Sequence, residues 1–174
     1  GVHKVVILGG GYIGLEMAET FRLLGHTVTV VEMMPRVVPN FDPSVSLLVQ
    51  TALEKNGVEL FSGSGVTELD AGSVALQNGT RIPADLVLVA TGVRPSTALA
   101  TAAGVQLGLT GAIAVSPQMV TNIPNIYAAG DCAESNHVLS NTPVWMPLGD
   151  VANRHGRVAG INMAGGHAEF PGVL

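Results

Sequence analysis

The chain has 174 residues, enough to bury a core, of which 47% are apolar, 12% charged and 4% aromatic. Its net charge of −5 and the lack of any Lys/Arg run argue against binding to nucleic acid or to an anionic membrane, and no apolar stretch approaches the ~18 residues of a transmembrane helix. So few aromatic residues predict an aliphatic core. So few charges predict a surface that is partly covered by something else, and we therefore expect this chain to be a piece of a larger protein.

Cysteine and histidine usage argues against two kinds of site. Cys132 is the only cysteine, which excludes an intrachain disulfide and a dithiol centre within this chain. The five histidines are scattered without metal-ligand spacing, so we expect no metal site. The first residues lead directly into an apolar run, without the basic and apolar regions of a signal peptide, which favours a cytoplasmic protein.

Residues 4–32 have the pattern of a dinucleotide site. An apolar run ends at Gly9, Gly11 and Gly14, a helical run follows, and a second apolar run ends in Glu32. In a strand–helix–strand unit these glycines permit, in order, a tight turn, the approach of the pyrophosphate and close packing of the helix on the strand. The N-terminus of the helix then faces the anion. Glu32 follows at close to the ~20-residue spacing of the acid that binds the adenosine ribose.

The next elements extend this unit into a β-α-β-α-β pattern. The first helix is predicted to bury a stripe of residues spaced by three and four (Ile13, Met17, Phe21 and Leu24) and to stop at Gly25. Asp42 is predicted to cap a second helix that ends at Asn56-Gly57. Its predicted apolar stripe is Val45, Leu48, Val49, Ala52 and Leu53. A third strand over 58–61 completes the first half of a doubly wound parallel sheet.

A small antiparallel meander interrupts the alternation of strands and helices. Three short strands over 65–69, 73–76 and 80–82 are separated by turn residues, among them Asn78-Gly79. The apolar run 85–90 then reads as a buried parallel strand that ends at Thr91-Gly92. Because ligands bind at the carboxyl ends of such strands, Gly92 would let the dinucleotide approach the backbone.

The last third of the chain carries a second informative stretch. We expect a short helix over 96–103 with Ser96 as its cap, and an extended segment over 105–115. A short strand then ends in Gly130-Asp131, where Asp131 either binds a sugar-like hydroxyl or caps the next helix. A final helix is predicted over 148–164, with one side formed by Val151, Ala152, His155, Val158, Ala159 and Asn162.

Three motifs in this order resemble the pyridine nucleotide–disulfide oxidoreductase family of flavoproteins. They are Gly9-x-Gly11-Tyr12-Ile13-Gly14-x-Glu16, Ala90-Thr91-Gly92-x-Arg94-Pro95, and Thr121-x6-Ala128-x-Gly130-Asp131-Cys132-Ala133-Glu134. The chain is most similar to the branch that holds coenzyme A disulfide reductase, NADH oxidase and NADH peroxidase. The resemblance covers essentially the whole chain.

The resemblance implies two cofactors, NAD(H) and FAD, and two domains. Residues 1–114 would form a Rossmann-like NAD(H)-binding domain, and 115–174 the returning segment of the FAD-binding domain. The N-terminal FAD part and the C-terminal dimerisation domain would lie outside the chain, as would the redox cysteines. The implied cofactor-binding residues are Gly9, Gly11, Tyr12, Ile13, Gly14, Glu32, Thr91, Gly92, Gly130 and Asp131. Glu16 would lie where the nicotinamide meets the flavin and is the candidate catalytic residue.

The implied activity is transfer of hydride from NADH to FAD and on to a disulfide, peroxide or oxygen, in a homodimer. Glu32 favours NADH over NADPH, because a carboxylate would repel a 2′-phosphate, although Arg36 lies nearby in the sequence. Two alternatives stay open at this point. One is a flavin reductase of a ferredoxin- or rubredoxin-like carrier, and the other is a non-catalytic NAD-sensing module. Cys132 lies outside the family's redox position, which indicates a structural cysteine.

Overall fold

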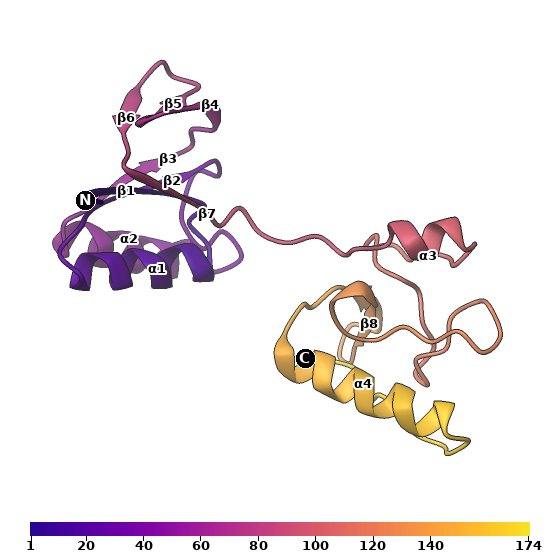
Figure 1. The fold of residues 1–174 in the computed structure, drawn as a ribbon. Coiled ribbons are helices and arrows are strands. Elements are labelled where there is room, and N and C mark those ends of the chain that lie inside the picture. The colour runs from indigo at the N-terminus through magenta and orange to yellow at the C-terminus, as the bar shows by residue number, and fades with distance from the viewer. The chain divides into compact units, whose positions relative to one another are not determined.

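The computed structural model describes Gly1–Leu174 and divides into two compact units, Gly1–Val93 and Arg94–Leu174, coloured from indigo to yellow along the chain in Figure 1. We describe them separately as the N-terminal and the C-terminal unit. The division falls earlier than the predicted boundary at 114. The reason is that Val105 and Ile113 pack in one cluster with Ala128 and Ala133, so residues 105–113 belong to the core of the C-terminal unit. The binding of one cofactor by each unit stays a prediction.

A four-stranded parallel sheet forms the centre of the N-terminal unit. Its strands are β1 (Lys4–Leu8), β2 (Thr27–Glu32), β3 (Val58–Ser62) and β7 (Leu86–Val89), in the order β3-β2-β1-β7. Central strand β1 is valine- and isoleucine-rich and buried on both faces, as expected for a parallel sheet. The Asp85 carboxylate accepts hydrogen bonds from the amides of His3 and Lys4 at 2.8 Å, and these bonds hold the start of β7 beside β1.

Two helices, α1 (Tyr12–Leu23) and α2 (Pro43–Lys55), cover one face of this sheet (Figure 1). The predicted caps are confirmed: Gly25 ends α1 at a φ of 85°, and the Asp42 carboxylate accepts from the Ser44 amide at 2.8 Å. Hydrogen bonds from the Ser44 hydroxyl and then its amide lower the pKa of Asp42.

The predicted buried stripes of both helices are confirmed only in part, at Met17 and Phe21 of α1 and at Leu53 of α2. Helix α1 buries Gly14 and Ala18 and packs Met17 and Phe21, whereas Ile13 and Leu24 are exposed. The reason is that small residues at 14 and 18 let the helix lie close to the sheet. Helix α2 buries Ser46 and packs Leu53, while Val45 and Leu48 are exposed. The Ser46 hydroxyl donates to the Val38 carbonyl at 3.4 Å, so a polar residue occupies the buried side.

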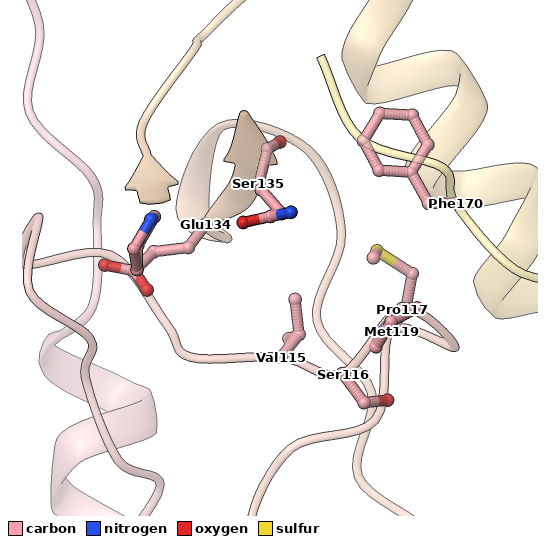
Figure 2. A pocket seen from close by; sticks show the side chains of 9 residues that line it. Val115, Ser116, Pro117, Met119, Glu134, Ser135 and Phe170 are labelled. Atoms are coloured by element: carbon pink, nitrogen blue, oxygen red, sulfur yellow. The ribbon is translucent and has the colours of Figure 1, made fainter. Parts of the chain in front are cut away.

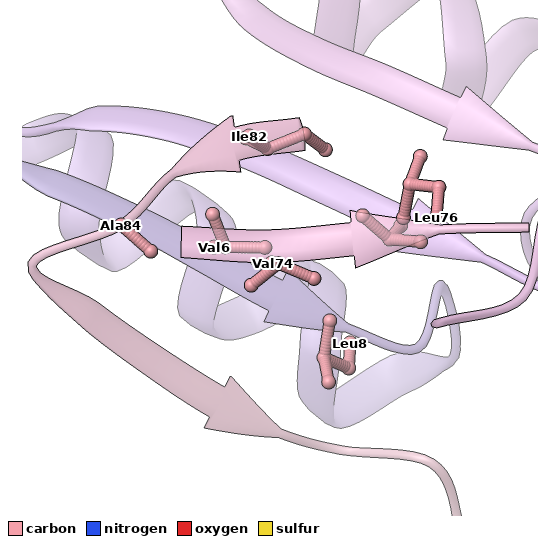
Figure 3. Packing of buried hydrophobic residues seen from close by; sticks show 7 residues of the cluster. Val6, Leu8, Val74, Leu76, Ile82 and Ala84 are labelled. Carbon is pink, nitrogen blue, oxygen red and sulfur yellow. The ribbon is translucent and has the colours of Figure 1, made fainter. Parts of the chain in front are cut away.

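The antiparallel meander covers the opposite face of the sheet. It consists of β4 (Val66–Asp70), β5 (Ser73–Leu76) and β6 (Arg81–Pro83) in the order β4-β5-β6. Alternate residues of β1 face the two layers: Val5 and Ile7 pack on the helix side, and Val6 and Leu8 pack against the meander. Figure 3 shows Val6 and Leu8 beside the buried meander side chains Val74, Leu76 and Ile82. The sheet is therefore sealed on both faces, as the predicted Rossmann-like fold with a meander requires.

The C-terminal unit contains α3 (Ala98–Ala102), a 3-10 turn η1 (Gly130–Cys132), the two-stranded sheet β8 (Ser135–His137) and β9 (Thr142–Val144), and α4 (Gly149–Met163). Helix α4 buries Val151, His155, Val158 and Ala159, which confirms the predicted side. Its core is completed by Met119, Phe170 and Val173.

Two local predictions in the C-terminal unit are wrong. Helix α3 begins only at Ala98, so its N-cap is Thr97 instead of Ser96. Thr97 makes no side-chain cap bond. The strand expected before Gly130 is reduced to one bridge between Val120 and Tyr127, since no neighbouring strand of this chain pairs with it. None of the helices has the length and apolar character that a membrane span requires.

Candidate dinucleotide-binding site

The glycine turn after β1 lies where the winding of the sheet changes direction. Strands β1, β2 and β3 follow one another outward, whereas β7 pairs with the other side of β1. The carboxyl ends of β1 and β7 therefore flank the switch point at which open α/β sheets bind ligands. This arrangement brings Thr91-Gly92, after β7, next to the glycine turn: the Thr91 amide nitrogen is 3.2 Å from where a Cβ of Gly9 would stand.

The three glycines of the motif meet different surroundings. Gly9 has a φ of 112°, and a Cβ there would stand 2.3 Å from the Ala90 carbonyl oxygen. A Cβ on Gly14 would stand 2.0 Å from the Gly9 carbonyl oxygen. Gly11 differs, because its φ of −84° suits any residue and a Cβ would meet nothing within 4 Å. Gly9 and Gly14 are thus required by the fold, and the space beside Gly11 is open.

The N-terminus of α1 is available to an anion. Gly11 is the N-cap and provides no side chain, so nothing in the protein caps the first-turn amides through a side chain. Four amides at a helix start lack intrahelical acceptors, and the macrodipole adds a partial positive charge there. With the open space at Gly11, this end of α1 can hold a phosphate group without moving any side chain.

Glu32 is buried and hydrogen-bonded to the loop around it, which its spacing in the sequence did not predict. It is 9% exposed, and its Oε2 accepts from the Gly10 amide at 2.6 Å while Oε1 accepts from the Met34 amide at 2.7 Å. The carboxylate therefore ties the glycine turn to the loop after β2. Each oxygen keeps a further lone pair that can accept from a hydroxyl.

Gly10 and Met34 are partners that the sequence analysis missed. A Cβ on Gly10 would stand 2.8 Å from Cγ1 of Val37 and 3.2 Å from the Glu32 side chain. The run of three glycines was the available signal, since the usual motif does not restrict the second position. The amide of Met34 could not be found from sequence, because any residue but proline offers the same donor.

The remaining residues predicted around this site lie on the surface of the N-terminal unit. Tyr12 and Glu16 are one helical turn apart on α1, and both are exposed. The Tyr12 ring makes an edge contact with Phe41, with centroids 5.9 Å apart. Ile13 is also exposed, as are Thr91 and Gly92. Glu16 makes no side-chain hydrogen bond, so its carboxylate is open to a ligand.

The C-terminal unit holds the other two predicted residues, Gly130 and Asp131, in turn η1. Gly130 has a φ of 77°, and its amide donates to Nδ1 of His155 at 3.2 Å. The indole Nε1 of Trp145 donates to the Asp131 carbonyl at 2.7 Å. The Asp131 carboxylate is exposed, caps no helix and accepts no hydrogen bond from the protein. The alternative that Asp131 serves as a helix cap is therefore wrong.

A cavity of about 170 Å³ in the C-terminal unit is separate from these residues. Figure 2 shows it between the 115–119 segment, Glu134, Ser135 and Phe170, and none of the predicted site residues lines it. Its one carboxylate is already bonded: Glu134 Oε1 accepts from the Thr110 amide at 2.7 Å and from its hydroxyl at 2.8 Å. One oxygen of the cavity's single carboxylate is thus used within the protein.

A parallel sheet with a glycine turn at its switch point, an uncapped helix start and an acid at the end of the next strand defines a dinucleotide-binding protein. The model of the pyridine nucleotide-disulphide oxidoreductase family matches residues 2–157. The chain belongs to that family.

Three proteins illustrate the similarity. The NAD(P)H sulfur oxidoreductase (CoA-dependent) of Pyrococcus furiosus is 41% identical over 176 residues, which are 99% of this chain and 40% of the relative. The NADH oxidase of Methanocaldococcus jannaschii is 41% identical over 178 residues, covering 100% of this chain and 40% of that protein. The solved structure of a NAD-dependent persulfide reductase from A. fulgidus superposes with a TM-score of 0.94 at 42% identity, over 100% of this chain and 33% of its own. The chain thus spans about 40% of the length of the curated relatives.

Proposed function

We propose that this chain is the NAD(H)-binding portion of an FAD-dependent oxidoreductase that passes hydride from NADH to FAD and on to a disulfide, peroxide or oxygen. The observation that carries the proposal is the open helix start at Gly11, beside the switch point and within one loop of Glu32. A pyrophosphate there would be bound by the first amides of α1, and a ribose hydroxyl by the remaining lone pairs of Glu32.

The C-terminal unit supports FAD as the second cofactor. A bound FAD would supply the hydride acceptor, and the exposed Asp131 carboxylate would accept from a hydroxyl of its ribityl chain. Helix α4 begins at Gly149 without a side-chain cap, so its positive end would stabilise negative charge on a reduced flavin. At the nicotinamide end, Tyr12 and Glu16 would line the contact, with Glu16 able to accept a hydrogen bond.

A sulfur-containing small molecule is the favoured final acceptor. Two of the three proteins compared above are named for sulfur or persulfide reduction, and the third is named an oxidase. The residues that select this acceptor would lie outside the 174 residues, as would the redox cysteine. We also expect the full-length protein to be cytoplasmic and to form a homodimer. Analytical ultracentrifugation tests the oligomeric state.

The visible absorption spectrum of the purified full-length protein tests the function directly. We expect a flavin spectrum that NADH bleaches in the absence of oxygen, and electrons that pass on to coenzyme A disulfide or a persulfide. A reductase of a ferredoxin- or rubredoxin-like carrier would show the same bleaching but would require the carrier protein for turnover. A colourless protein that binds NADH would contradict the proposal and indicate an NAD-sensing module.

We propose that NADH is preferred over NADPH, and that Glu32 and Arg36 set the balance. Arg36 lies in the loop after β2, donates only to the Pro39 carbonyl at 3.5 Å, and has a buried Nε without a partner. It is therefore a cation without a salt bridge, four residues after Glu32 in the sequence.

The substitution Glu32→Arg should invert this preference. Because Glu32 also holds the Gly10 and Met34 amides, the change should open the loop and weaken the binding of both nucleotides. The affinity for NADH should fall by the larger factor. The informative quantity is therefore the ratio of the two dissociation constants, measured by fluorescence titration. Glu32→Gln is the matched control, since it disturbs the same bonds without adding a cation. An unchanged ratio of dissociation constants in Glu32→Arg would show that Glu32 does not determine the preference for NADH.

A further inference from the structure

Two side chains hold the Gly130–Asp131 turn from different segments. Trp145, which follows β9, donates its indole N–H to the Asp131 carbonyl at 2.7 Å. His155, in the middle of α4, accepts the Gly130 amide at Nδ1 over 3.2 Å. The turn lies close to α4, since a Cβ at Gly130 would be in van der Waals contact with Cβ of Ala152, 3.4 Å away. Both backbone groups next to the Asp131 carboxylate are thus fixed by side chains.

The hydrogen bonds of His155 define its protonation state. Nδ1 accepts from a backbone N–H, so it carries no proton, and the proton of the neutral ring is on Nε2. Nε2 therefore donates to the Ser135 hydroxyl at 3.1 Å. The ring is 0% exposed and packs edge-on against Phe170, with centroids 4.4 Å apart. This buried histidine is thus hydrogen-bonded through both ring nitrogens.

We propose that His155 and Trp145 are positioning residues that hold the Gly130–Asp131 turn so that the Asp131 carboxylate stays free to bind the cofactor. The inference rests on the proposed function, in which Asp131 binds a ribityl hydroxyl of FAD. A leucine at 155 would satisfy the packing of α4 as well as histidine does, but it would leave the Gly130 amide without an acceptor. A part-buried donor that loses its acceptor is unfavourable, and the turn would avoid this by moving away from its present geometry.

Protonation of His155 should have the same effect as its removal. A proton on Nδ1 would place two donors, the ring and the Gly130 amide, against each other. Burial, and then the positive charge of Arg154, lower the pKa of His155, so the neutral ring is the form of the folded protein. The other titratable groups on the segments around the ring are Asp131 and Cys132 in the turn, Glu134 and His137 at β8, and Glu169 next to Phe170. None of them makes a hydrogen bond to the ring.

The direction of the pH effect follows from this pKa. Because the pKa is lowered in the folded protein, the bond to Gly130 is fully present above the ordinary histidine value of about 6.5. It is lost as the pH falls through the lower value of the folded state. We therefore expect FAD to bind the wild-type protein more weakly as the pH falls below about 6.5 toward that lower value.

The test is FAD affinity in the full-length protein, measured by flavin fluorescence after removal and titration of the cofactor, with far-UV circular dichroism as the folding control. At pH 7.5, His155→Leu should raise the dissociation constant about tenfold or more, as the loss of ~1.4 kcal/mol or more requires. His155→Asn keeps an acceptor near Nδ1 and does not titrate, so it should stay within a few-fold of wild type and lose the pH dependence. Trp145→Phe should weaken FAD binding without changing the pH profile.

Wild-type affinity in folded His155→Leu, or a pH profile that His155→Asn leaves unchanged, would overturn the inference alone. A wild-type protein that binds no FAD at pH 7.5 would overturn the proposed function together with it. The two failures are therefore distinguishable in one set of titrations.

Discussion

At the scale of single residues, the glycine motif combines two requirements that sequence cannot separate. Gly9 and Gly14 are required by contacts within the N-terminal unit, because a Cβ at either would overlap a backbone carbonyl oxygen. Gly11 has no such contact and an ordinary extended φ. A glycine that the fold does not need, placed at an uncapped helix start, indicates a position kept small for a ligand.

Alanine substitutions should separate these roles. Gly11→Ala should leave the free energy of unfolding within about 0.5 kcal/mol of wild type, since the new methyl group meets open space. It should raise the NADH dissociation constant about tenfold or more, because the methyl group would occupy the position where the pyrophosphate approaches the backbone. Urea unfolding and NADH titration of the same preparation give both quantities.

Gly14→Ala is the matched comparison on the same helix. Alanine normally favours a helix interior by about 1 kcal/mol over glycine, but here its Cβ would stand 2.0 Å from the Gly9 carbonyl oxygen. We expect a net loss of about 1–3 kcal/mol of unfolding free energy, as in other overpacked sites. If Gly11→Ala destabilised the protein as much as Gly14→Ala, the space beside Gly11 would not be a ligand site.

The sequence predicted the residues at this site better than their contacts. The glycine spacing and the acid at the end of the second strand are local patterns, and the structure places both at the switch point. The bonds from Glu32 to Gly10 and Met34 depend on how two loops meet, which no spacing encodes. His155 was predicted to lie on the buried side of its helix, but its bond to Gly130 joins segments 25 residues apart.

At the scale of elements, the helices show why apolar periodicity predicts a helix more reliably than its buried side. Helices α1 and α2 formed where the spacing predicted them, yet α1 buries Gly14 and Ala18, and α2 buries Ser46. Small residues were preferred against the sheet, and large apolar residues such as Leu23 and Leu48 stayed exposed. Close approach of helix and sheet decided the orientation of each helix.

The meander is the element whose packing closes the second face of the sheet. Val74 in β5 is 0% exposed and packs with Val6 and Leu8 of β1 (Figure 3). Val74→Ala should cost about 2 kcal/mol of unfolding free energy, from the lost transfer free energy of two methyl groups and the cavity left behind. Chemical denaturation followed by circular dichroism measures this cost.

Leu69 in β4 offers the control for this substitution. It is 53% exposed, so Leu69→Ala should change the free energy of unfolding by no more than about 0.5 kcal/mol. Comparable losses for the two variants would mean that the meander is not docked on the sheet through β5.

At the scale of the whole molecule, the two units were predictable to different degrees. Every strand of the N-terminal unit pairs with a neighbour within that unit, and its sequence pattern predicted each one. In the C-terminal unit, the segment before Gly130 has a strand-like sequence but only the bridge between Val120 and Tyr127. A strand pattern becomes a strand only when a partner is present, and this partner is expected in the part of the relatives that the chain does not span.

This difference predicts how the 174-residue chain should bind its two cofactors when it is produced alone. All predicted NAD(H) contacts, from Gly9 to Gly92, lie in the N-terminal unit, which has its own core on both faces of its sheet. We therefore expect NADH binding to be retained. The FAD contacts predicted in the C-terminal unit are few, namely Gly130, Asp131 and the start of α4. The isolated chain should therefore release FAD during gel filtration, whereas the full-length protein should keep it. Absorbance at the flavin band in the protein peak measures the retained fraction. A stoichiometric flavin peak with the isolated chain would show that the C-terminal unit is a complete FAD site by itself, and would contradict the proposal that most of that site is contributed by other segments.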